Sequence, residues 1–264
     1  RITITSAGSG DPAGVITCFR APGTVRVNGN LSETGWNVNR SFSKVTVGSP
    51  NNTATFGVMW DNSNLYIGAR VLDANRFSDS PNPWDDDAVE IYIDANNNKS
   101  TTYDGRDNQI IKNYNKSTVF TKFAITGLQH AWASVTGGYA IEVAIPWSQL
   151  NISAPAQGTT LGFDIGYDDD DNGGAREHQA VWNGNINNFQ NTSAFGSLVL
   201  NGATSGGGGS GGRMATYSES EESVEEPKVN YWPNEVTDKL HITSDGSFET
   251  VVIADLPGRF HVSE

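Results

Sequence analysis

Hydrophobic and polar residues alternate in short runs along most of the chain, and such runs predict β-strands. A repeat of two places successive side chains on opposite faces of a strand. The alternating runs are residues 53–60, 65–73, 89–94, 109–114, 118–124, 131–135, 139–146, 160–167, 179–182 and 197–200. Residues 147–150 suggest one short helical turn. About ten to twelve short strands with polar turns between them, and no amphipathic helix, predict an all-β fold, an antiparallel β-sandwich.

The same pattern predicts the division of the chain. Residues 1–20 are expected to form an edge strand or an ordered extension, and residues 21–202 the sandwich. Residues 203–228 join a Gly/Ser run to a Glu-rich run, which is typical of a linker because such segments bury almost nothing. Residues 229–264 regain β character, but so short a piece cannot bury a large core, which predicts a small and incomplete β domain.

The composition of the chain limits the classes of partner that it is expected to bind. Asp and Glu number 30 against 17 Lys and Arg, which gives a formal net charge of −13. Nucleic acid is therefore not an expected partner, because phosphate binding needs a basic surface. No apolar run approaches the roughly 20 residues that span a bilayer, so no membrane span is expected. Cys18 is the single cysteine, so stability is expected from core burial and bound metal rather than from an intrachain disulfide.

The most informative stretch joins a proline-marked turn, which presents Trp84, to a strand with Glu90 on its polar face. A pyranose packs its apolar C–H face on an indole and donates hydroxyl hydrogens to carboxylates, so this pair suits a sugar. Pro83 and Asp85 flank the tryptophan and disfavour its deep burial. The alternative interpretation is a tryptophan that caps the edge of the core beside a solvated acidic turn.

A second aromatic residue, Phe189, lies in the amide-rich loop 183–193. It is a candidate for a ring opposite Trp84, with the amides of Asn187 and Asn188 as hydrogen-bond partners for sugar hydroxyls. The alternative role for this phenylalanine is to anchor its loop. Four other tryptophans lie in apolar patterns that predict core positions, namely Trp36, Trp60, Trp132 and Trp147.

Two segments place oxygen-bearing side chains at alternate positions. They are Asp94, Asn96 and Asn98, and Asp168, Asp170 and Asn172. This spacing lets a short loop wrap a cation that takes six to eight oxygen ligands, so calcium is the expected cofactor. Neither segment is an EF-hand, because flanking helices are not evident and Gln179 stands where the last glutamate would be. Plain solvated turns are the alternative.

Sequence motifs of enzymes are mostly missing. The chain has no Gly-x-Ser-x-Gly elbow, phosphate-binding loop or His-Glu-x-x-His pattern. Acidic pairs exist, but a glycosidase needs two carboxylates that face each other across a cleft, which spacing along one strand cannot show. We therefore expect a protein that is not itself an enzyme.

A series of ordered motifs runs through nearly the whole predicted sandwich. They are Val27-Asn28-Gly29, Glu33 with Trp36, Trp60-Asp61, Leu65-Tyr66, Asn82-Pro83-Trp84-Asp85, Val89-Glu90-Ile91, Gly138-Tyr139, Ile141-Glu142, Gly162-Phe163 and Phe195-Gly196. Together they resemble the family 9 carbohydrate-binding modules, which are attached to xylanases and other bacterial glycan-degrading enzymes. The resemblance implies a calcium-bearing β-sandwich that clamps a sugar between two aromatic rings. It also implies plant-type polysaccharide or oligosaccharide ends as partners, and a fragment of, or partner to, a glycoside hydrolase.

The resemblance assigns roles to particular positions. Trp84 matches the first ring of the family, Phe189 the second, Glu90 the hydrogen-bonding acid and Asn113 a polar contact residue. The family has a tryptophan at the second ring and an arginine at the position of Ile111. Both departures reduce what the site offers a sugar, stacking area in one case and a charge-assisted donor in the other, so weak binding is expected.

The tail carries a second resemblance, in Tyr231-Trp232-Pro233-Asn234-Glu235 and Val251-Val252-Ile253-Ala254-Asp255 with Pro257-Gly258. These segments are similar to the start of the C-terminal sorting domains read by the type IX secretion machinery of Bacteroidetes, with a glutamate in place of the usual second proline. The resemblance implies a secreted or cell-surface protein with that machinery as a partner. The alternative function is a calcium-stabilised structural or adhesion spacer whose tail is a secretion or attachment signal.

Overall fold

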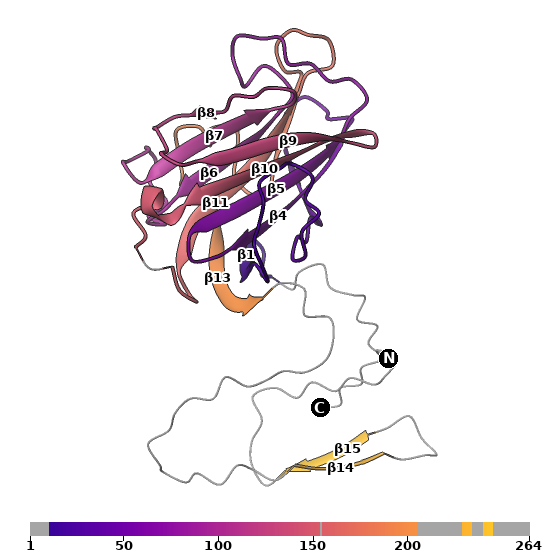
Figure 1. The fold of residues 1–264 in the computed structure, drawn as a ribbon, viewed down its shortest axis with the longest axis vertical. Coiled ribbons are helices and arrows are strands. Elements are labelled where there is room, and N and C mark those ends of the chain that lie inside the picture. The colour runs from indigo at the N-terminus through magenta and orange to yellow at the C-terminus, as the bar shows by residue number, and fades with distance from the viewer. Residues whose placement is uncertain (1–10, 154, 205–228, 234–239, 245–264) are drawn as a thin grey trace. The chain divides into compact units, whose positions relative to one another are not determined.

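The computed structural model describes residues 11–153, 155–204, 229–233 and 240–244. Those up to residue 204 belong to one compact unit, and the last two segments belong to another. Figure 1 shows that the larger unit is built almost entirely of strands. In the described part of the chain, no helix is long and apolar enough to cross a membrane.

The described residues of the larger unit form thirteen strands and one 3₁₀ turn. The strands are β1 (Val15–Arg20), β2 (Arg40–Ser41), β3 (Lys44–Val47), β4 (Thr53–Trp60), β5 (Asn64–Leu72), β6 (Ala88–Asp94), β7 (Asp107–Asn113), β8 (Phe120–Thr121), β9 (Gln129–Val135), β10 (Gly138–Pro146), β11 (Thr160–Asp169), β12 (His178–Val181) and β13 (Gly196–Thr204). The turn is η1 (Trp147–Leu150), where a helical turn was predicted. The predicted all-β sandwich is confirmed.

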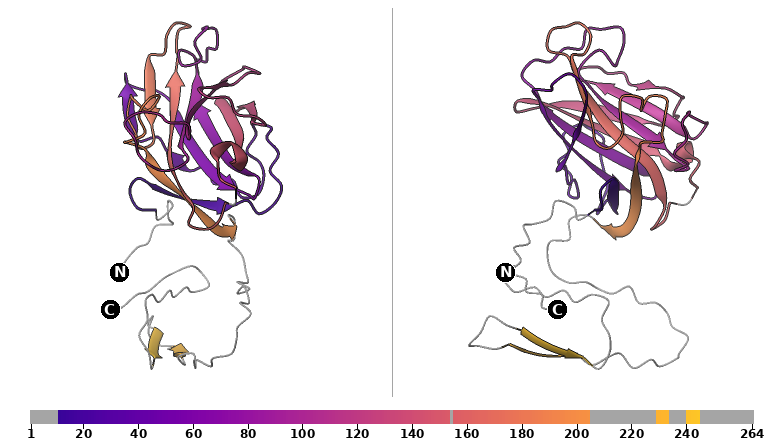
Figure 2. Two further views of the ribbon diagram at one scale, coloured as in Figure 1. Left: turned by 90° about the vertical axis from the view of Figure 1, so that its left-hand side faces the viewer. Right: turned by 180° about the vertical axis from the view of Figure 1, so that it is seen from behind.

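The main path of hydrogen-bonded strands is β8-β7-β6-β11-β13-β1-β4-β5-β10-β9. β1 is parallel to both of its neighbours, whereas the other pairs along the path are antiparallel. Its register against β13 shifts after Phe19, and Phe19 and Arg20 also pair with β4. The sheet curls at this strand into two layers (Figures 1 and 2). The strand β1 is thus the internal strand that joins the layers and not the edge strand that was one expectation for residues 1–20, of which residues 1–10 lie outside the described part of the chain.

The core lies between these layers and follows the alternation of the strands. Val89, Ile91 and Ile93 of β6 belong to the same buried cluster as Phe56 of β4 and Phe163 of β11. This face excludes water, and burying each such side chain contributes about 1.5–3 kcal/mol. The apolar pattern alone was enough to identify these inward positions.

Two of the four tryptophans predicted to lie in the core are fully buried. Trp60 and Trp147 are 1% and 2% exposed, and their rings meet edge to face with centroids 6.3 Å apart. Trp36 and Trp132 are only partly buried and pack against the core from outside. The aromatic sequence motifs thus serve packing except at Trp84, which remains 40% exposed.

The motif around Gly29 has a structural explanation. Gly29 has a φ of +84°, and a side chain there would come within 2.4 Å of the backbone of Trp132. The Glu142 carboxylate on β10 accepts hydrogen bonds from the backbone N–H groups of Asn28 at 2.8 Å and Gly29 at 2.9 Å. Only glycine satisfies both the dihedral angle and the close approach.

The opposite face of β6 carries polar side chains, but it is buried and not exposed to solvent. Glu90, Tyr92 and Asp94 are 1%, 2% and 0% exposed, although alternation places them away from the core. Phe195, from the segment just before β13, packs on Tyr92 with ring centroids 6.0 Å apart. Polar groups are buried only when they are hydrogen-bonded, so this covered face must contain an organised polar network.

The second unit contains the hairpin of β14 (Val229–Pro233) and β15 (Leu240–Ser244). The two strands are antiparallel, with Val229 opposite Ser244 and Pro233 opposite Leu240. The later part of the tail motif, residues 251–258, and all but the first two residues of the predicted linker 203–228 lie outside the described residues.

Candidate functional site

A cavity of about 410 Å³ opens on the covered face of β6. Its lining residues are Trp84, Glu90, Tyr92, Gln109, Phe120, Lys122, Arg176, Gln179, Ile186 and Phe189. Strands β6, β7 and β12 supply the buried polar side chains, and the loops supply the exposed apolar ones. The volume suits a small ligand, and the combination of apolar surface with few polar groups is typical of binding sites.

The two predicted aromatic rings lie in this one cavity. Trp84 is 40% exposed and Phe189 is 44% exposed, so both keep apolar surface that a ligand could cover. Phe120 adds a third ring, edge to face with Trp84 at a centroid distance of 6.2 Å. Exposed aromatic groups gathered around a hollow are typical of an interaction site.

Trp84 projects from a turn that is held at both ends. The backbone N–H of Asp85 donates to the carbonyl of Asn82 at 3.1 Å, and the Asn82 amide donates to the Asp85 carboxylate at 2.9 Å. The amide nitrogen of Asn113 donates to the carbonyl of Pro83 at 2.6 Å. Asn113 therefore lies beside this turn and outside the cavity lining, where it positions the tryptophan.

The predicted amides of the Phe189 loop also lie outside the aromatic cavity. Asn188 is buried, donates to the Asp164 carboxylate at 2.5 Å and accepts from the N–H of Asn185 at 2.9 Å. Asn187 lines a neighbouring cavity. The structure thus brings Phe189 and Glu90 into the cavity of Trp84, but not Asn113, Asn187 or Asn188.

Glu90 is the centre of the buried network. Its Oε2 accepts hydrogen bonds from the Tyr92 hydroxyl at 2.5 Å and from the Gln109 amide at 2.6 Å. Its Oε1 accepts from the Arg176 guanidinium at 3.1 Å and, more weakly, from Gln179 at 3.5 Å. These four donors engage the acceptor capacity of the carboxylate before any ligand binds.

A second buried carboxylate shares the same cation. Asp168 on β11 accepts from Arg176 at 2.6 Å and from Gln179 at 2.8 Å. Burial, reinforced by the nearby charge of Glu90, raises the pKa of Asp168 well above its ordinary value, and Arg176 opposes that rise. One guanidinium therefore serves two acids at the base of the cavity, and the raised pKa of Asp168 favours a retained proton over a second buried negative charge.

The network keeps hydrogen-bonding groups that no described residue engages. The carbonyl oxygen of the Gln109 side chain has no hydrogen bond to another described residue, and the Arg176 guanidinium retains further N–H groups. Hydroxyl groups both donate and accept, so they match this mixture of an acceptor and donors.

Ile111, the departure from the family pattern, faces Glu90 across the β6–β7 pair and Phe120 across the β7–β8 pair. It is fully buried and apolar, so this position contributes no donor to the cavity. Sequence reasoning missed Phe120, although its place opposite Ile111 follows once the β7–β8 register is known. It also missed Gln109, which occupies the same strand face two residues before Ile111.

Two groups of aspartates converge away from the aromatic cavity. The first comprises Asp73, Asp87 and Asp169, all buried, and the second comprises Asp79, Asp86 and Asp170. In each group one carboxylate oxygen per residue lies within 4.8 Å of the others. A third combination adds Asp171 and His178 to Asp169.

The first two groups fit a divalent cation because all their members except the exposed Asp79 have a buried, unsatisfied carboxylate oxygen. Asp73, Asp87 and Asp169 each retain one buried carboxylate oxygen without a hydrogen-bond partner, as do Asp86 and Asp170. Burial and neighbouring carboxylates raise the pKa of Asp87 to about 9, and burial raises that of Asp169 to about 6. Like charges brought together in this way are unfavourable unless a cation or protons neutralise them.

The sequence-based metal candidates are distributed differently. Asp170 belongs to the second aspartate group, but Asp168 lies in the Glu90 network and the Asn172 amide donates to Glu177. The carboxylate of Asp94 accepts the backbone N–H groups of residues 98 and 99.

In that same turn, Asn96 and Asn98 donate their side-chain amides to Asp104 at 3.3 and 2.8 Å. The alternate spacing of Asp94, Asn96 and Asn98 therefore produces a hydrogen-bonded turn. Within the described residues, the groups that could hold a metal do not include Asp94.

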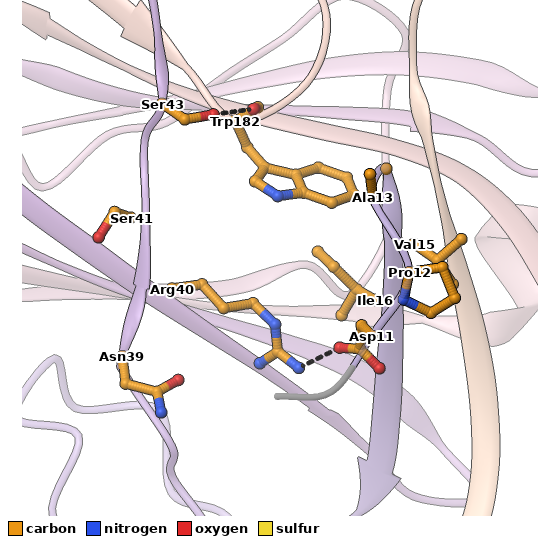
Figure 3. Close-up of a pocket in the computed structure, with 11 residues that line it drawn as sticks. Asp11, Pro12, Ala13, Val15, Ile16, Asn39, Arg40, Ser41, Ser43 and Trp182 are labelled. Carbon is orange, nitrogen blue, oxygen red and sulfur yellow. Dashed lines mark hydrogen bonds and ion pairs between the residues drawn. The ribbon is translucent and has the colours of Figure 1, made fainter. Parts of the chain in front are cut away.

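Another cavity, of about 400 Å³, opens between the start of β1 and the β2–β3 segment (Figure 3). Arg40 and Asp11 form an ion pair across it at 2.9 Å, so these charges neutralise each other. The ring of Trp182 borders it but packs on Phe56 and Phe163, both at 6.2 Å. This cavity therefore lacks the exposed aromatic surface of the first.

Comparison with known proteins identifies the family. Residues 27–203 match a family model described as carbohydrate family 9 binding domain-like. The chain belongs to this family. The resemblance inferred from the ordered motifs is thus confirmed for the sandwich, and family 9 modules are non-catalytic binding domains.

The relatives that this family 9 module matches are long enzymes, and each match covers a small part of the enzyme. It is 36% identical over 188 residues to endo-1,4-beta-xylanase A of Thermoanaerobacterium saccharolyticum, which covers 70% of this chain and 16% of the relative. It is 35% identical over 199 residues to exoglucanase XynX of Acetivibrio thermocellus, covering 74% and 18%. The chain therefore spans less than a fifth of the length of either enzyme.

Two solved structures share the fold of the module. They are complexes of a family 9 carbohydrate-binding module from Caldicellulosiruptor kristjanssonii with cellotriose and with glucose. Each is 26% identical with a TM-score of 0.62, and covers 72% of this chain and 95% or 97% of the other.

Replacing Arg176 with Gln should destabilise the module by roughly 3 kcal/mol, because Glu90 and Asp168 would remain buried without their shared cation. The loss should be larger at pH 8 than at pH 5. The raised pKa of Asp168 makes the folded protein hold a proton that the unfolded chain releases above about pH 4. The free energy of unfolding therefore falls as the pH rises. Urea unfolding at both pH values measures this, with the exposed Arg70→Gln as control. Equal stability of the two variants at pH 8 would contradict the prediction.

Proposed function

We propose that this family 9 module is a non-catalytic carbohydrate-binding domain that holds a sugar ring between Trp84 and Phe189. The observation that carries the proposal is the pairing of two exposed aromatic rings with a buried polar network in one cavity. The rings supply apolar faces for the C–H surface of a pyranose. The network around Glu90 supplies groups of fixed orientation for its hydroxyls.

The expected energetics favour stacking as the source of affinity and the polar groups as the source of orientation. An aromatic contact of this kind contributes about 0.5–1.5 kcal/mol beyond the area it buries. Glu90 is already saturated with donors, so it holds Tyr92, Gln109 and Arg176 in place, and a sugar meets the remaining groups of those side chains. The complexes of the Caldicellulosiruptor module with glucose and cellotriose support the ends of plant-type glycans as ligands.

Calcium is the proposed structural cofactor. Asp73, Asp87 and Asp169 would hold one ion, and Asp79 with Asp86 and Asp170 would hold another. Calcium prefers carboxylate oxygens, and its charge would neutralise acids that otherwise repel each other. The ions would join the segment between β5 and β6, which carries Trp84, to the end of β11.

The remaining proposals concern location. The tail motif supports export by type IX secretion machinery, and a glycan ligand supports a place outside the cell or on its surface. In that setting the module would hold a longer protein, such as a glycoside hydrolase, on polysaccharide. The alternative is a calcium-stabilised spacer, for which the aromatic cavity would have no ligand.

Replacing Trp84 with Ala should weaken binding of cellobiose by at least about tenfold, because it removes roughly 1.5 kcal/mol of stacking. Phe189→Trp should strengthen binding, since an indole offers a larger face. Calorimetric titration of the full chain with cellobiose, xylobiose and their alditols measures both effects. Phe123→Ala is the control, because Phe123 is 46% exposed and lies outside the cavity lining. A folded protein that binds none of these sugars would favour the spacer.

Removal of calcium should lower the melting temperature. An ion present at 100 times its Kd stabilises the folded state by about 2.7 kcal/mol, which corresponds to roughly 5–10 °C in a domain of this size. Scanning calorimetry with calcium or EDTA measures the shift. Asp87→Asn should reduce the response, whereas Asp85→Asn, in the same acidic run but outside both aspartate groups, should retain it. No response of the unsubstituted protein to EDTA would contradict the proposal.

Deleting residues 229–264 should leave sugar affinity unchanged and prevent export, if the tail is the proposed sorting signal. Expression of the full and truncated chains in a bacterium with type IX secretion, followed by fractionation, measures the distribution. A matched chain in which residues 231–235 are reversed in order tests the motif without changing length. Equal amounts of both chains in the medium would show that the tail is not required.

A further inference from the structure

A polar cavity of about 450 Å³ shares Lys122 with the aromatic cavity. Its lining includes the hydroxyl groups of Thr101 and Thr102, the ring of Tyr103 and the amide of Gln190. It has no carboxylate in its lining. In a chain with a net charge of −13, a hollow with one ammonium group and no lining acid differs sharply from the rest of the molecule.

One loop separates the two cavities. Ile186 and Phe189 line the aromatic side, whereas Asn187 and Gln190 line the polar side. Its residues therefore contribute to both hollows within a span of five positions. A ligand that lies against Phe189 would be close to the polar cavity as well.

Lys122 is the group common to both cavities. Its Nζ donates to the carbonyl of Phe189 at 2.6 Å and lies 4.8 Å from the centroid of the Tyr103 ring. The described residues place no carboxylate within ion-pair distance of it. An ammonium group has three donors, so two remain for a ligand.

The groups that line the polar cavity beside Lys122 are neutral donors and acceptors. Burial, with the charges of Asp107 and Glu90, raises the pKa of Tyr103, so this phenol keeps its proton and donates to the carbonyl of Asn188 at 2.6 Å. Hydroxyl and amide groups around a lone ammonium can solvate an anion without competing for it.

We propose that the polar cavity takes an anionic substituent of the glycan, a uronic acid carboxylate or a sulfate ester, while the adjoining sugar ring lies in the aromatic cavity. This inference rests on the proposed sugar-binding function. It adds a preference for acid-bearing glycans, which the aromatic rings and the Glu90 network do not produce. The network beneath the aromatic cavity offers an anion no unpaired cation, because Glu90 and Asp168 already share Arg176.

The expected effect is moderate and depends on salt. One ammonium at about 4 Å from an anion in a solvated hollow should tighten binding about fivefold at low ionic strength. Screening at high ionic strength should remove most of that gain. Both features distinguish a charge contact from an added hydroxyl contact.

The test is calorimetric titration of the full chain with matched ligand pairs at low and high salt. One pair is xylobiose with and without a glucuronic acid substituent, and the other is cellobiose with and without a sulfate ester. We expect tighter binding of at least one anionic partner, and its identity distinguishes carboxylate from sulfate. Lys122→Gln should abolish the preference, measured as the ratio of affinities within each matched pair, because an effect on the Phe189 loop would change the neutral and the anionic partner alike. Arg70→Gln makes the same charge change at an exposed site on β5 and should preserve the preference.

The possible outcomes distinguish a failure of the anion-binding inference from a failure of the proposed sugar-binding function. If neutral sugars bind and neither anionic partner binds more tightly, the polar cavity has no such role. If the preference survives Lys122→Gln, the anion is held elsewhere and the inference is overturned. If neutral and anionic sugars both fail to bind the folded protein, the proposed function fails first.

Discussion

The sharing of Arg176 by Glu90 and Asp168 is the interaction on which the rest of the site depends. It joins β6 and β11, which are neighbours in the sheet, to the loop that precedes β12. Without that guanidinium two buried acids would face each other, at a cost that a domain of modest stability could not absorb. With it, Tyr92 and Gln109 are held by the same carboxylate and the base of the cavity becomes rigid.

Other buried charges near β6 are arranged differently from the pair that shares Arg176. The aspartates between β5 and β6 and those at the end of β11 converge into groups with unsatisfied oxygens, which a cation would stabilise. Lys112, by contrast, is a buried cation whose hydrogen-bond partners are backbone carbonyls and not carboxylates. It is buried with its Nζ bonded to backbone carbonyls, among them those of Asn113 and Thr118 at 3.2 Å, and burial lowers its pKa to about 8. This ammonium orders the turn that leads to Phe120 and Lys122.

The exposed aromatic rings keep their positions because hydrogen bonds hold the segments that carry them. Trp84 and Phe189 gain little from packing on the core, so their positions depend on the segments that present them. The Trp84 turn is held through Asn113, and the Phe189 loop is held through Lys122 and through Asn188 on Asp164. Rings fixed in this way lose little freedom when a ligand arrives, which favours binding by a surface that is otherwise modest.

The sequence by itself determined those features that depend on neighbours along the chain. Alternation predicted the strands and their core faces, and the local order of Trp84 before Glu90 predicted an exposed ring beside an acid. The spacing of Asp94, Asn96 and Asn98 predicted a metal-binding loop, whereas the groups of this turn form hydrogen bonds with one another and with nearby residues. Spacing along the chain could not predict that carboxylates from separate segments converge.

Tertiary structure decided which distant segments meet. Asp73, Asp87 and Asp169 converge only because β6 pairs with β11, and a period of two does not specify a strand's neighbour. The same sheet order brings Arg176 to Glu90, although 86 positions separate them. It also buries the polar face of β6, which alternation alone would leave in water. Strand order and loop packing carry that information, since they are set by the summed burial of the whole domain rather than by any one segment.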